Sequence, residues 1–118
     1  MSAPSPPTIA KLLGLLGLAQ RAGKLAVGAT AVEGLIHRGR RPVVIVAEDA
    51  GSALLRRLQS QGPERCVLVR AASRHELGKA LGRDQVAAVA VTDRGFVNGI
   101  VKLGLVQTSR PAPEREGT

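Results

Sequence analysis

The stretch Gly17–Glu33, with the sequence GLAQRAGKLAVGATAVE, is the most informative part of this chain. It predicts the end of one helix, a short extended link and a second helix that opens at Gly28. No carboxylate precedes Glu33 within it. Backbone amides at a helix start, a glycine without a Cβ atom and the nearby cations Arg21 and Lys24 suit a polyanionic ligand rather than acid–base catalysis.

Length and composition indicate one globular domain. The 118 residues are enough for a single core, and a hydrophobic content of 44% argues against disorder. The core must be aliphatic, because Phe96 is the only aromatic residue. This excludes RNA-binding folds that stack bases on rows of aromatic side chains.

The charge balance points to an anionic partner. Lysine and arginine total 17 against 9 acidic residues, which gives a formal net charge of +8. A coding bias toward arginine would explain the ratio of arginine to lysine, but not the excess of basic over acidic residues. Arginine binds phosphate through planar, bidentate contacts. We therefore expect nucleic acid or another anionic surface as the partner.

Targeting and cysteine signals favour the cytoplasm. The single Cys66 cannot form an internal disulfide or build a metal site by itself. The N-terminus lacks a basic region followed by an apolar run of secretory type. Ile9–Leu18 is apolar but too short to span a bilayer. We expect a cytoplasmic protein without a membrane segment.

Hydrophobic periodicity predicts strands alternating with helices, and hence an α/β sheet covered on both faces. Thr8 is a fair N-cap for the first helix, Ser73 and Glu76 have capping-box spacing, and Asp93 caps the last helix. The expected helices cover 9–21, 29–38, 52–61, 74–82 and 94–103, and the expected strands cover 24–27, 43–47, 66–69 and 86–91. The domain is expected over 8–105, between a disordered arm (1–7) and a disordered tail (106–118).

No set of residues predicts an active site. Glu48 and Asp49 form the only adjacent acidic pair, without a third carboxylate or a histidine in register, so we expect Asp49 to cap a helix and Glu48 to be solvated. His37 and His75 are isolated and expected at the surface. Cys66 begins an apolar strand and is expected to be a small buried hydrophobe. We expect no catalytic residue, metal or cofactor.

The basic residues fall mainly at predicted helix ends and loops. For Arg21, Lys24 and Gly28 we favour contact with phosphates. For some others, an ordinary solvated surface and phosphate contact remain equally open; these are Arg56, Arg57, Arg65 and Arg70. The basic run Arg38–Arg41 has neither the spacing nor the preceding strand of a phosphate loop.

Four segments stand out together along the chain: Gly17–Gly28 (GLAQRAGKLAVG), Val43–Ala50 (VVIVAEDA), His75–Gly82 (HELGKALG) and Ala88–Asp93 (AVAVTD). In their order and spacing, they resemble the kink-turn RNA-binding ribosomal protein family of the archaeal L-seven-Ae and L-thirty-e type. The resemblance covers roughly residues 9–104 and is nearest to the bacterial YlxQ-like branch. It implies a three-layer α/β/α sandwich with a mixed sheet of about four strands.

The same resemblance implies where RNA binds. The helix start Gly28-Ala29-Thr30-Ala31 would meet the kinked backbone and its G·A pairs. The loop Arg83-Asp84-Gln85-Val86 would cover a base flipped out of the stack, and Leu55 would pack against that base. Strong binders in the family have Gly-Thr-Asn-Glu at the helix start, where Asn and Glu read guanine edges. Here Thr30 keeps one hydrogen-bonding group and Ala31 has none, so specificity is expected to be weaker or different.

The resulting hypothesis is a non-enzymatic, monomeric RNA-binding protein that acts on ribosomal or other structured RNA, with other ribonucleoprotein components as further partners. The alternative is a protein-interaction module on the same fold that has lost specific RNA recognition. A small nucleotide-binding enzyme is disfavoured, because no catalytic set is present.

Overall fold

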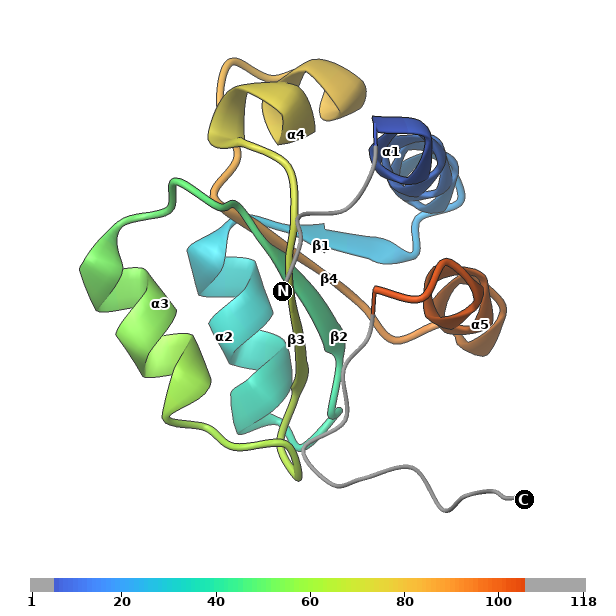
Figure 1. Cartoon of the computed structure of the whole chain (residues 1–118). Helices are drawn as coiled ribbons and strands as arrows, with labels where there is room; N and C mark the ends of the chain where they lie inside the picture. Colours follow the sequence, from blue (N-terminus) through green and yellow to red (C-terminus); the bar gives the residue numbers. More distant parts are fainter. Residues whose placement is uncertain (1–5, 106–118) are drawn as a thin grey trace.

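The computed structural model describes residues 6–105, which form five helices and four strands (Figure 1). All nine predicted elements are present, with their ends shifted by no more than three residues. In chain order they are α1 (Pro6–Arg21), β1 (Leu25–Val27), α2 (Ala29–His37), β2 (Val43–Val46), α3 (Ser52–Gln59), β3 (Val67–Arg70), α4 (Arg74–Leu81), β4 (Ala88–Val91) and α5 (Arg94–Lys102).

The four strands form one mixed sheet in the order β1-β4-β2-β3. Strand β4 is antiparallel to both of its neighbours, β1 and β2, whereas β2 and β3 are parallel. Helices α2 and α3 cover one face of the sheet, and α1, α4 and α5 cover the other (Figure 1). This confirms the predicted three-layer α/β/α sandwich with a mixed sheet.

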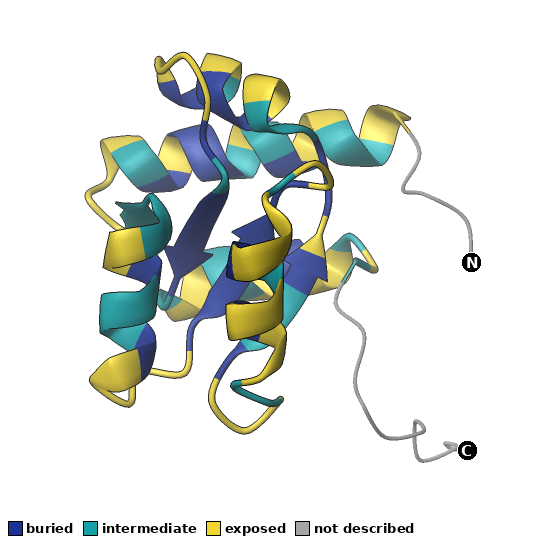
Figure 2. Ribbon diagram, turned by 90° about the vertical axis from the view of Figure 1, so that its left-hand side faces the viewer, coloured by how far each residue is buried: buried dark blue, intermediate teal, exposed yellow. Residues whose placement is uncertain are grey.

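Alternation along the central strands divides the core into two halves. Val43 and Ile45 of β2 pack toward α1, α4 and α5, while Val44 and Val46 pack toward α2 and α3. Successive side chains of a strand point to opposite faces, so a run without polar residues serves both layers. All four β2 residues are buried, and the sheet is the buried centre of the molecule (Figure 2).

Two helix starts confirm the predicted caps. Ser73 Oγ accepts the backbone N–H of Glu76 at 3.0 Å, and Glu76 Oε1 accepts the N–H of Ser73 at 2.9 Å, which completes the capping box. Asp93 Oδ2 accepts the N–H of Phe96 at 3.2 Å and opens α5. Gly82 ends α4 with a left-handed φ of 74°, which a residue without a Cβ atom adopts readily.

Two predictions about the elements were wrong. Thr8 does not cap α1, because the helix begins at Pro6; proline suits a first helical turn, where its missing N–H has no intrahelical partner. The expected 66–69 strand is not buried throughout, because β3 (Val67–Arg70) lies at the edge of the sheet and its residues Val67 and Leu68 are only half-buried. The rest of the expected arm (1–5) and the expected tail (106–118) lie outside the described residues.

Candidate nucleic-acid interface

Three helix starts meet at one end of the sheet, where the chain enters β4. The N–H of Gly28 donates to Ala88 O at 2.8 Å, and the N–H of Ala47 donates to Ala87 O at 2.8 Å. The N–H of Val86 donates to Arg74 O at 3.0 Å. Residues 86–88, where the chain enters β4, therefore connect the starts of α2 and α4 with the end of β2, from which the chain continues to α3. We call this region the Gly28 end of the sheet.

Gly28 has a backbone conformation that other residues avoid. Its φ is 98° and its ψ is 155°, a region occupied almost only by glycine. This conformation turns the chain from β1 directly into α2. The sequence therefore places glycine where the link and the helix meet for a steric reason.

The start of α2 has no side-chain cap. In an α-helix the first N–H groups lack intrahelical acceptors, and they carry the positive end of the helix dipole. Thr30 and Ala31 are exposed and Ala29 is half-buried, so these amides face a region open to solvent. The backbone arrangement is suited to an anionic ligand.

The loop from Arg83 to Ala87 lies against α4 because Gly78 has no side chain. A Cβ atom built on Gly78 would lie 2.6 Å from Asp84 O and 2.8 Å from Arg83 O. The N–H of Arg83 donates to Gly78 O at 2.8 Å. Arg83, Asp84 and Gln85 are exposed, so the loop presents three polar side chains beside the start of β4.

Val86 differs from the other residues of this loop. Its side chain is 4% exposed and belongs to the core half beneath α1, α4 and α5. Together with the hydrogen bond to Arg74 O, this burial anchors the loop. Val86 therefore faces the core, and only the first three residues of the predicted loop face solvent.

Apolar residues lie at the Gly28 end on the α2/α3 side of the sheet. Ala29, Leu55 and Ala87 are each partly exposed and pack against the same half of the core. Leu55 lies in the first turn of α3, where its N–H donates to Gly51 O at 3.1 Å. The Gly28 end thus joins an apolar patch to exposed amides, the combination that a splayed base beside a phosphate backbone requires.

The structure does not place Arg21 and Lys24 beside Gly28. Strand β1 separates them, and four extended residues from Lys24 to Gly28 span about 13 Å. Lys24 adjoins Leu25, which pairs with Val91 at the opposite end of β4 (Figure 1). The Arg21 guanidinium folds back along α1 toward Gly17. Both cations are exposed, but at the far end of β1.

Two more arginines lie at the Gly28 end: Arg70, which the sequence left open between a solvated surface and phosphate contact, and Arg74, which sequence reasoning missed. Arg70 Nη2 donates to Glu48 O at 3.0 Å, and Arg74 Nε lies 3.6 Å from Asp49 Oδ2. Asp49 Oδ1 also accepts the N–H of Arg74 at 2.8 Å, so Asp49 caps a helix as predicted, but that helix is α4. This hydrogen bond is the main cause that lowers the pKa of Asp49. The sequence offered one indication of these contacts, because Glu48 and Asp49 directly follow a buried strand, where acidic groups can hold basic side chains.

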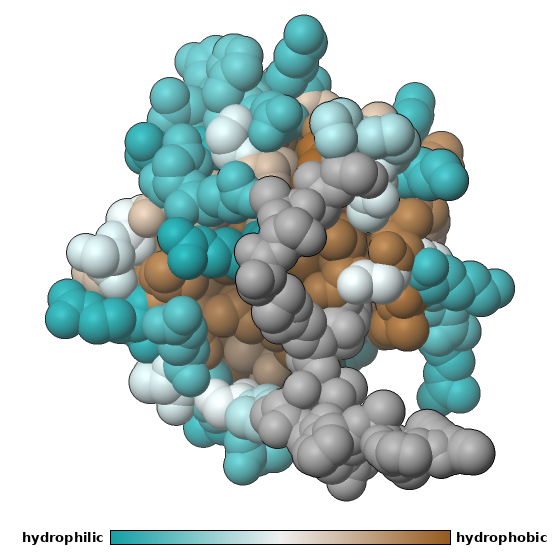
Figure 3. All heavy atoms as spheres, viewed as in Figure 1, coloured by the Kyte–Doolittle hydropathy of each residue, from teal (hydrophilic) through white to brown (hydrophobic). Residues whose placement is uncertain are grey.

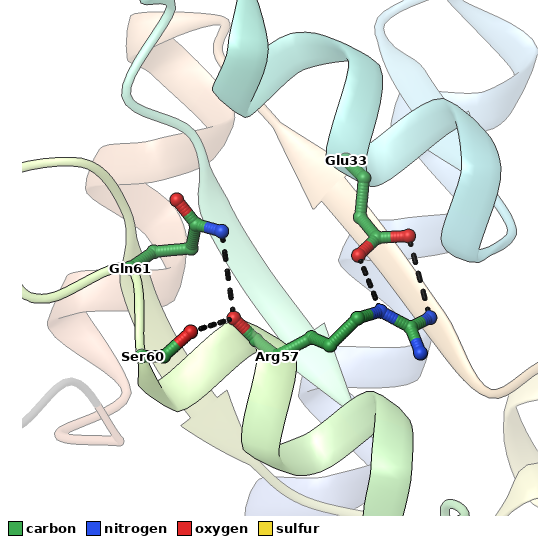
Figure 4. A network of polar contacts seen from close by, with 4 residues as sticks. All are labelled: Glu33, Arg57, Ser60 and Gln61. Atoms are coloured by element: carbon green, nitrogen blue, oxygen red, sulfur yellow. Dashed lines mark hydrogen bonds and ion pairs between the residues drawn. The ribbon is translucent and has the colours of Figure 1, made fainter.

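One ion pair joins α2 and α3 across the surface. Arg57 Nε donates to Glu33 Oε2 at 2.9 Å, and Ser60 Oγ donates to Arg57 O (Figure 4). The hydrogen bond from Arg57 lowers the pKa of Glu33. Arg57 is thus held by a carboxylate, whereas the exposed side chain of Arg56 makes no hydrogen bond or ion pair within residues 6–105.

The two histidines and Cys66 lie where the sequence predicted. His37 and His75 are exposed, and Cys66 is 3% exposed with a pKa raised by burial. Among residues 6–105, no three His, Cys, Asp or Glu side chains gather into a potential metal site. In the same part of the chain, no helix has the length and apolar character that a bilayer span requires.

Comparison with known proteins identifies the family. Residues 10–101 match the model of the ribosomal protein L7Ae/L30e/S12e/Gadd45 family. The chain belongs to this family. The match begins within α1 and ends within α5, so it covers the sheet and every element at the Gly28 end.

Individual relatives agree with this assignment. The chain is 34% identical over 90 residues to the RNA-binding protein YlxQ of Bacillus subtilis (strain 168), which covers 75% of this chain and 90% of that protein. A structure of a protein with unknown function from Bacillus halodurans C is 33% identical, with a TM-score of 0.73 over 80% of this chain and 96% of that one. The Giardia lamblia 15.5kD RNA binding protein, 18% identical, shares the fold with a TM-score of 0.72 over 87% of this chain and 89% of its own.

Proposed function

We propose that this protein is a non-enzymatic RNA-binding protein of the cytoplasm. It would hold a kink-turn or a related internal loop of structured RNA at the Gly28 end of the sheet, as a monomer. Family membership and similarity to a protein named for RNA binding support the choice of RNA. Among structured RNAs, ribosomal RNA is the proposed ligand. Other ribonucleoprotein components are proposed partners.

The observation that carries the proposal is the meeting of three kinds of group at one end of the sheet. The exposed amides of α2 follow Gly28, the loop with the polar side chains of Arg83, Asp84 and Gln85 leads into β4 at the same end, and the half-buried Leu55 lies in the first turn of α3 there. Amides suit phosphate oxygens, and an aliphatic side chain suits the face of an extruded base. A kink brings phosphates close together, so cations and amides placed at it gain more than on a straight duplex.

The basic residues then take different positions on the RNA. Arg70 and Arg74 flank the Gly28 end on the β3 side, where they would contact the backbone at the kink. Arg21 and Lys24 lie beyond β1 and would contact an RNA arm that leaves the kink past this edge strand. Figure 3 shows hydrophilic side chains gathered over α4, at the end of the molecule where α2, α3 and α4 begin.

Specificity follows from the side chains at the helix start. Ala29 and Ala31 offer no hydrogen-bonding group to a base edge, and Thr30 offers one hydroxyl. In protein–DNA complexes, a bidentate contact between a side chain and a base contributes about 1–3 kcal/mol to discrimination between bases, and we take the same range for a lost guanine contact here. We therefore propose that backbone contacts supply most of the affinity and that discrimination between RNAs is modest.

A gel-shift titration at moderate salt tests the function. It compares a kink-turn RNA with a matched RNA from which the G·A pairs have been removed. We expect tighter binding to the kink-turn RNA. Equal binding of both would reduce the function to general RNA affinity.

Failure to bind either RNA would favour the second candidate, a protein-interaction module. The specific observation in its favour is the same pair of alanines, Ala29 and Ala31, because they remove the side chains that would read guanines. The net charge of +8 opposes it.

A further inference from the structure

A second basic surface lies at the opposite end of the sheet from Gly28. It consists of exposed arginines on two loops, one between α2 and β2 and the other between α3 and β3. We call it the distal arginine patch; its members are Arg38, Arg40, Arg41 and Arg65. The two loops lie side by side below α2 and α3 in the view of Figure 1.

Hydrogen bonds hold the two loops together and orient two of the guanidiniums. The N–H of Val67 donates to Pro42 O at 3.0 Å. Arg41 Nη2 donates to Pro63 O at 3.0 Å, and Arg65 Nη2 donates to Ile36 O at 3.4 Å. A guanidinium has five N–H donors, so each of these two side chains keeps most of its donors for an external acceptor.

The distal arginine patch is not neutralised by the protein. Within residues 6–105, none of its four guanidiniums lies within 4.0 Å of a carboxylate. The only acidic residue in the two loops is Glu64, and the nearest carboxylate on α2, that of Glu33, is already held by Arg57 (Figure 4). The four guanidiniums repel one another, and the negative end of the α2 dipole, at the C-terminus of that helix, offsets only part of this repulsion. Uncompensated like charges destabilise the folded state, so their presence points to an anion that binds them.

The backbone supports a role for the side chain of Arg41. Its φ of 49° lies in the left-handed region, which favours glycine and asparagine. Gly39, two residues earlier, also has a left-handed φ, of 75°, and there the residue is a glycine, which adopts this conformation readily. Arg41 occupies the strained position with a long cationic side chain directed toward Pro63.

We propose that the distal arginine patch binds the phosphate backbone of a duplex arm that flanks the internal loop held at the Gly28 end. This inference rests on the proposed function. The nine residues of α2 separate the two surfaces by about 13 Å, so one RNA can follow α2 and contact both. Planar guanidiniums match phosphate oxygens.

A membrane surface is disfavoured as the ligand. Within residues 6–105, the exposed large hydrophobic side chains are Leu18 and Val101, on α1 and α5. Both helices belong to the other layer of the sandwich. Within the described residues, the distal arginine patch therefore has no large exposed hydrophobic side chain to insert beside a lipid headgroup.

The test compares two double variants that lower the net charge equally. Arg40→Gln with Arg65→Gln removes one cation from each loop of the patch. Lys11→Gln with Lys102→Gln is the matched control, because both lysines are exposed on α1 and α5. Thermal melts of both variants establish that they are folded. The RNAs share one kink-turn, and one of them has its flanking duplexes extended by a few base pairs.

We expect the unmodified protein to bind the extended RNA more tightly than the short one. The Arg40/Arg65 variant should lose about tenfold in affinity for the extended RNA, and its slope of log K against log salt should fall by one to two, at about 0.9 per phosphate contact. Its affinity for the short RNA and its preference for the kink-turn should stay unchanged, as should all properties of the lysine control.

Equal losses in the two variants, or no loss in the Arg40/Arg65 variant, would overturn the inference. If the unmodified protein binds neither RNA, the proposed function fails, and the inference fails with it. These outcomes are distinguishable, because only the last one involves the unmodified protein.

Discussion

The starts of α2 and α4 lie at the same end of the sheet but treat their free amides differently. At α4, side chains accept the N–H groups of Ser73, Arg74 and Glu76. At α2, Gly28 supplies no side-chain acceptor. The two helix starts therefore suit different roles, because a helix start whose amides are already hydrogen-bonded to side chains has none to offer a ligand. The start of α2 therefore keeps amides free for a ligand, and we propose it as the RNA-binding surface that the start of α4 supports.

The largest effect is expected where α4 supports the loop. In Gly78→Ala, the added Cβ atom would collide with backbone oxygens of Arg83 and Asp84, which cannot rotate away. We expect a loss of about 1–3 kcal/mol in the free energy of unfolding, together with weaker RNA binding. Urea denaturation and gel shifts measure the two effects.

The matched control is Gly14→Ala. Gly14 is an exposed helical glycine with no atom within 4 Å of its built Cβ atom. Alanine should stabilise α1 by about 0.5–1 kcal/mol and leave RNA binding unchanged. If Gly78→Ala resembles Gly14→Ala, α4 does not position the loop in the way we describe.

Gly28→Ala acts on the start of α2 itself. The strained φ and ψ should cost about 1–3 kcal/mol of stability, and the amides that follow should be misdirected. RNA affinity should fall by at least tenfold in a filter-binding titration. Gly51→Ala is the control, because the N-cap Gly51 of α3 has a φ of −59° that any residue adopts. Equal RNA affinity of the two variants would contradict a special role for Gly28.

Ser73→Ala removes the capping box of α4. The loss of this cap should cost about 1 kcal/mol, seen as a lower urea midpoint. RNA affinity should remain within about twofold, because the N–H groups involved face the protein's own acceptors. A loss of RNA binding larger than that of Gly28→Ala would reverse the assignment of the two helix starts.

The smallest effect concerns the acid dependence of stability. The N–H of Arg74 holds the pKa of Asp49 below its ordinary value. A lowered pKa in the folded state stabilises the protein above the unfolded pKa of about 4, and this contribution is lost as the pH falls through the folded pKa. Asp49→Asn should therefore lower the urea midpoint at pH 7 and converge with the unmodified protein in acid. A difference independent of pH would exclude this carboxylate as the cause.

Local signals predicted much of the fold. The uninterrupted apolar run of Val43–Val46 fixed a central strand, and Ser73 with Glu76 fixed the start of α4. Such features depend on neighbours a few residues away. The edge position of β3 was not predictable in this way, because it depends on the order of strands in the sheet.

The candidate site was only partly predictable for the same reason. Gly28 was found because its positive φ requires a glycine. The separation of Lys24 from Gly28 follows from the extended strand that was predicted over 24–27, but the grouping of Arg21, Lys24 and Gly28 by sequence proximity did not take it into account. Arg70 and Arg74 reach the site through contacts with Glu48 and Asp49, which are more than twenty residues away in sequence. The contact of Gly78 with the loop likewise required the packed structure.

The most direct test of the central claim is an NMR titration that follows the backbone amide shifts as a kink-turn RNA is added. We predict that the largest changes fall on Gly28–Ala31 and on the loop from Arg83 to Ala87, with small changes along α5. Changes confined to α1 and α5, with the amides of Gly28–Ala31 unmoved, would contradict the assignment of this end of the sheet to RNA.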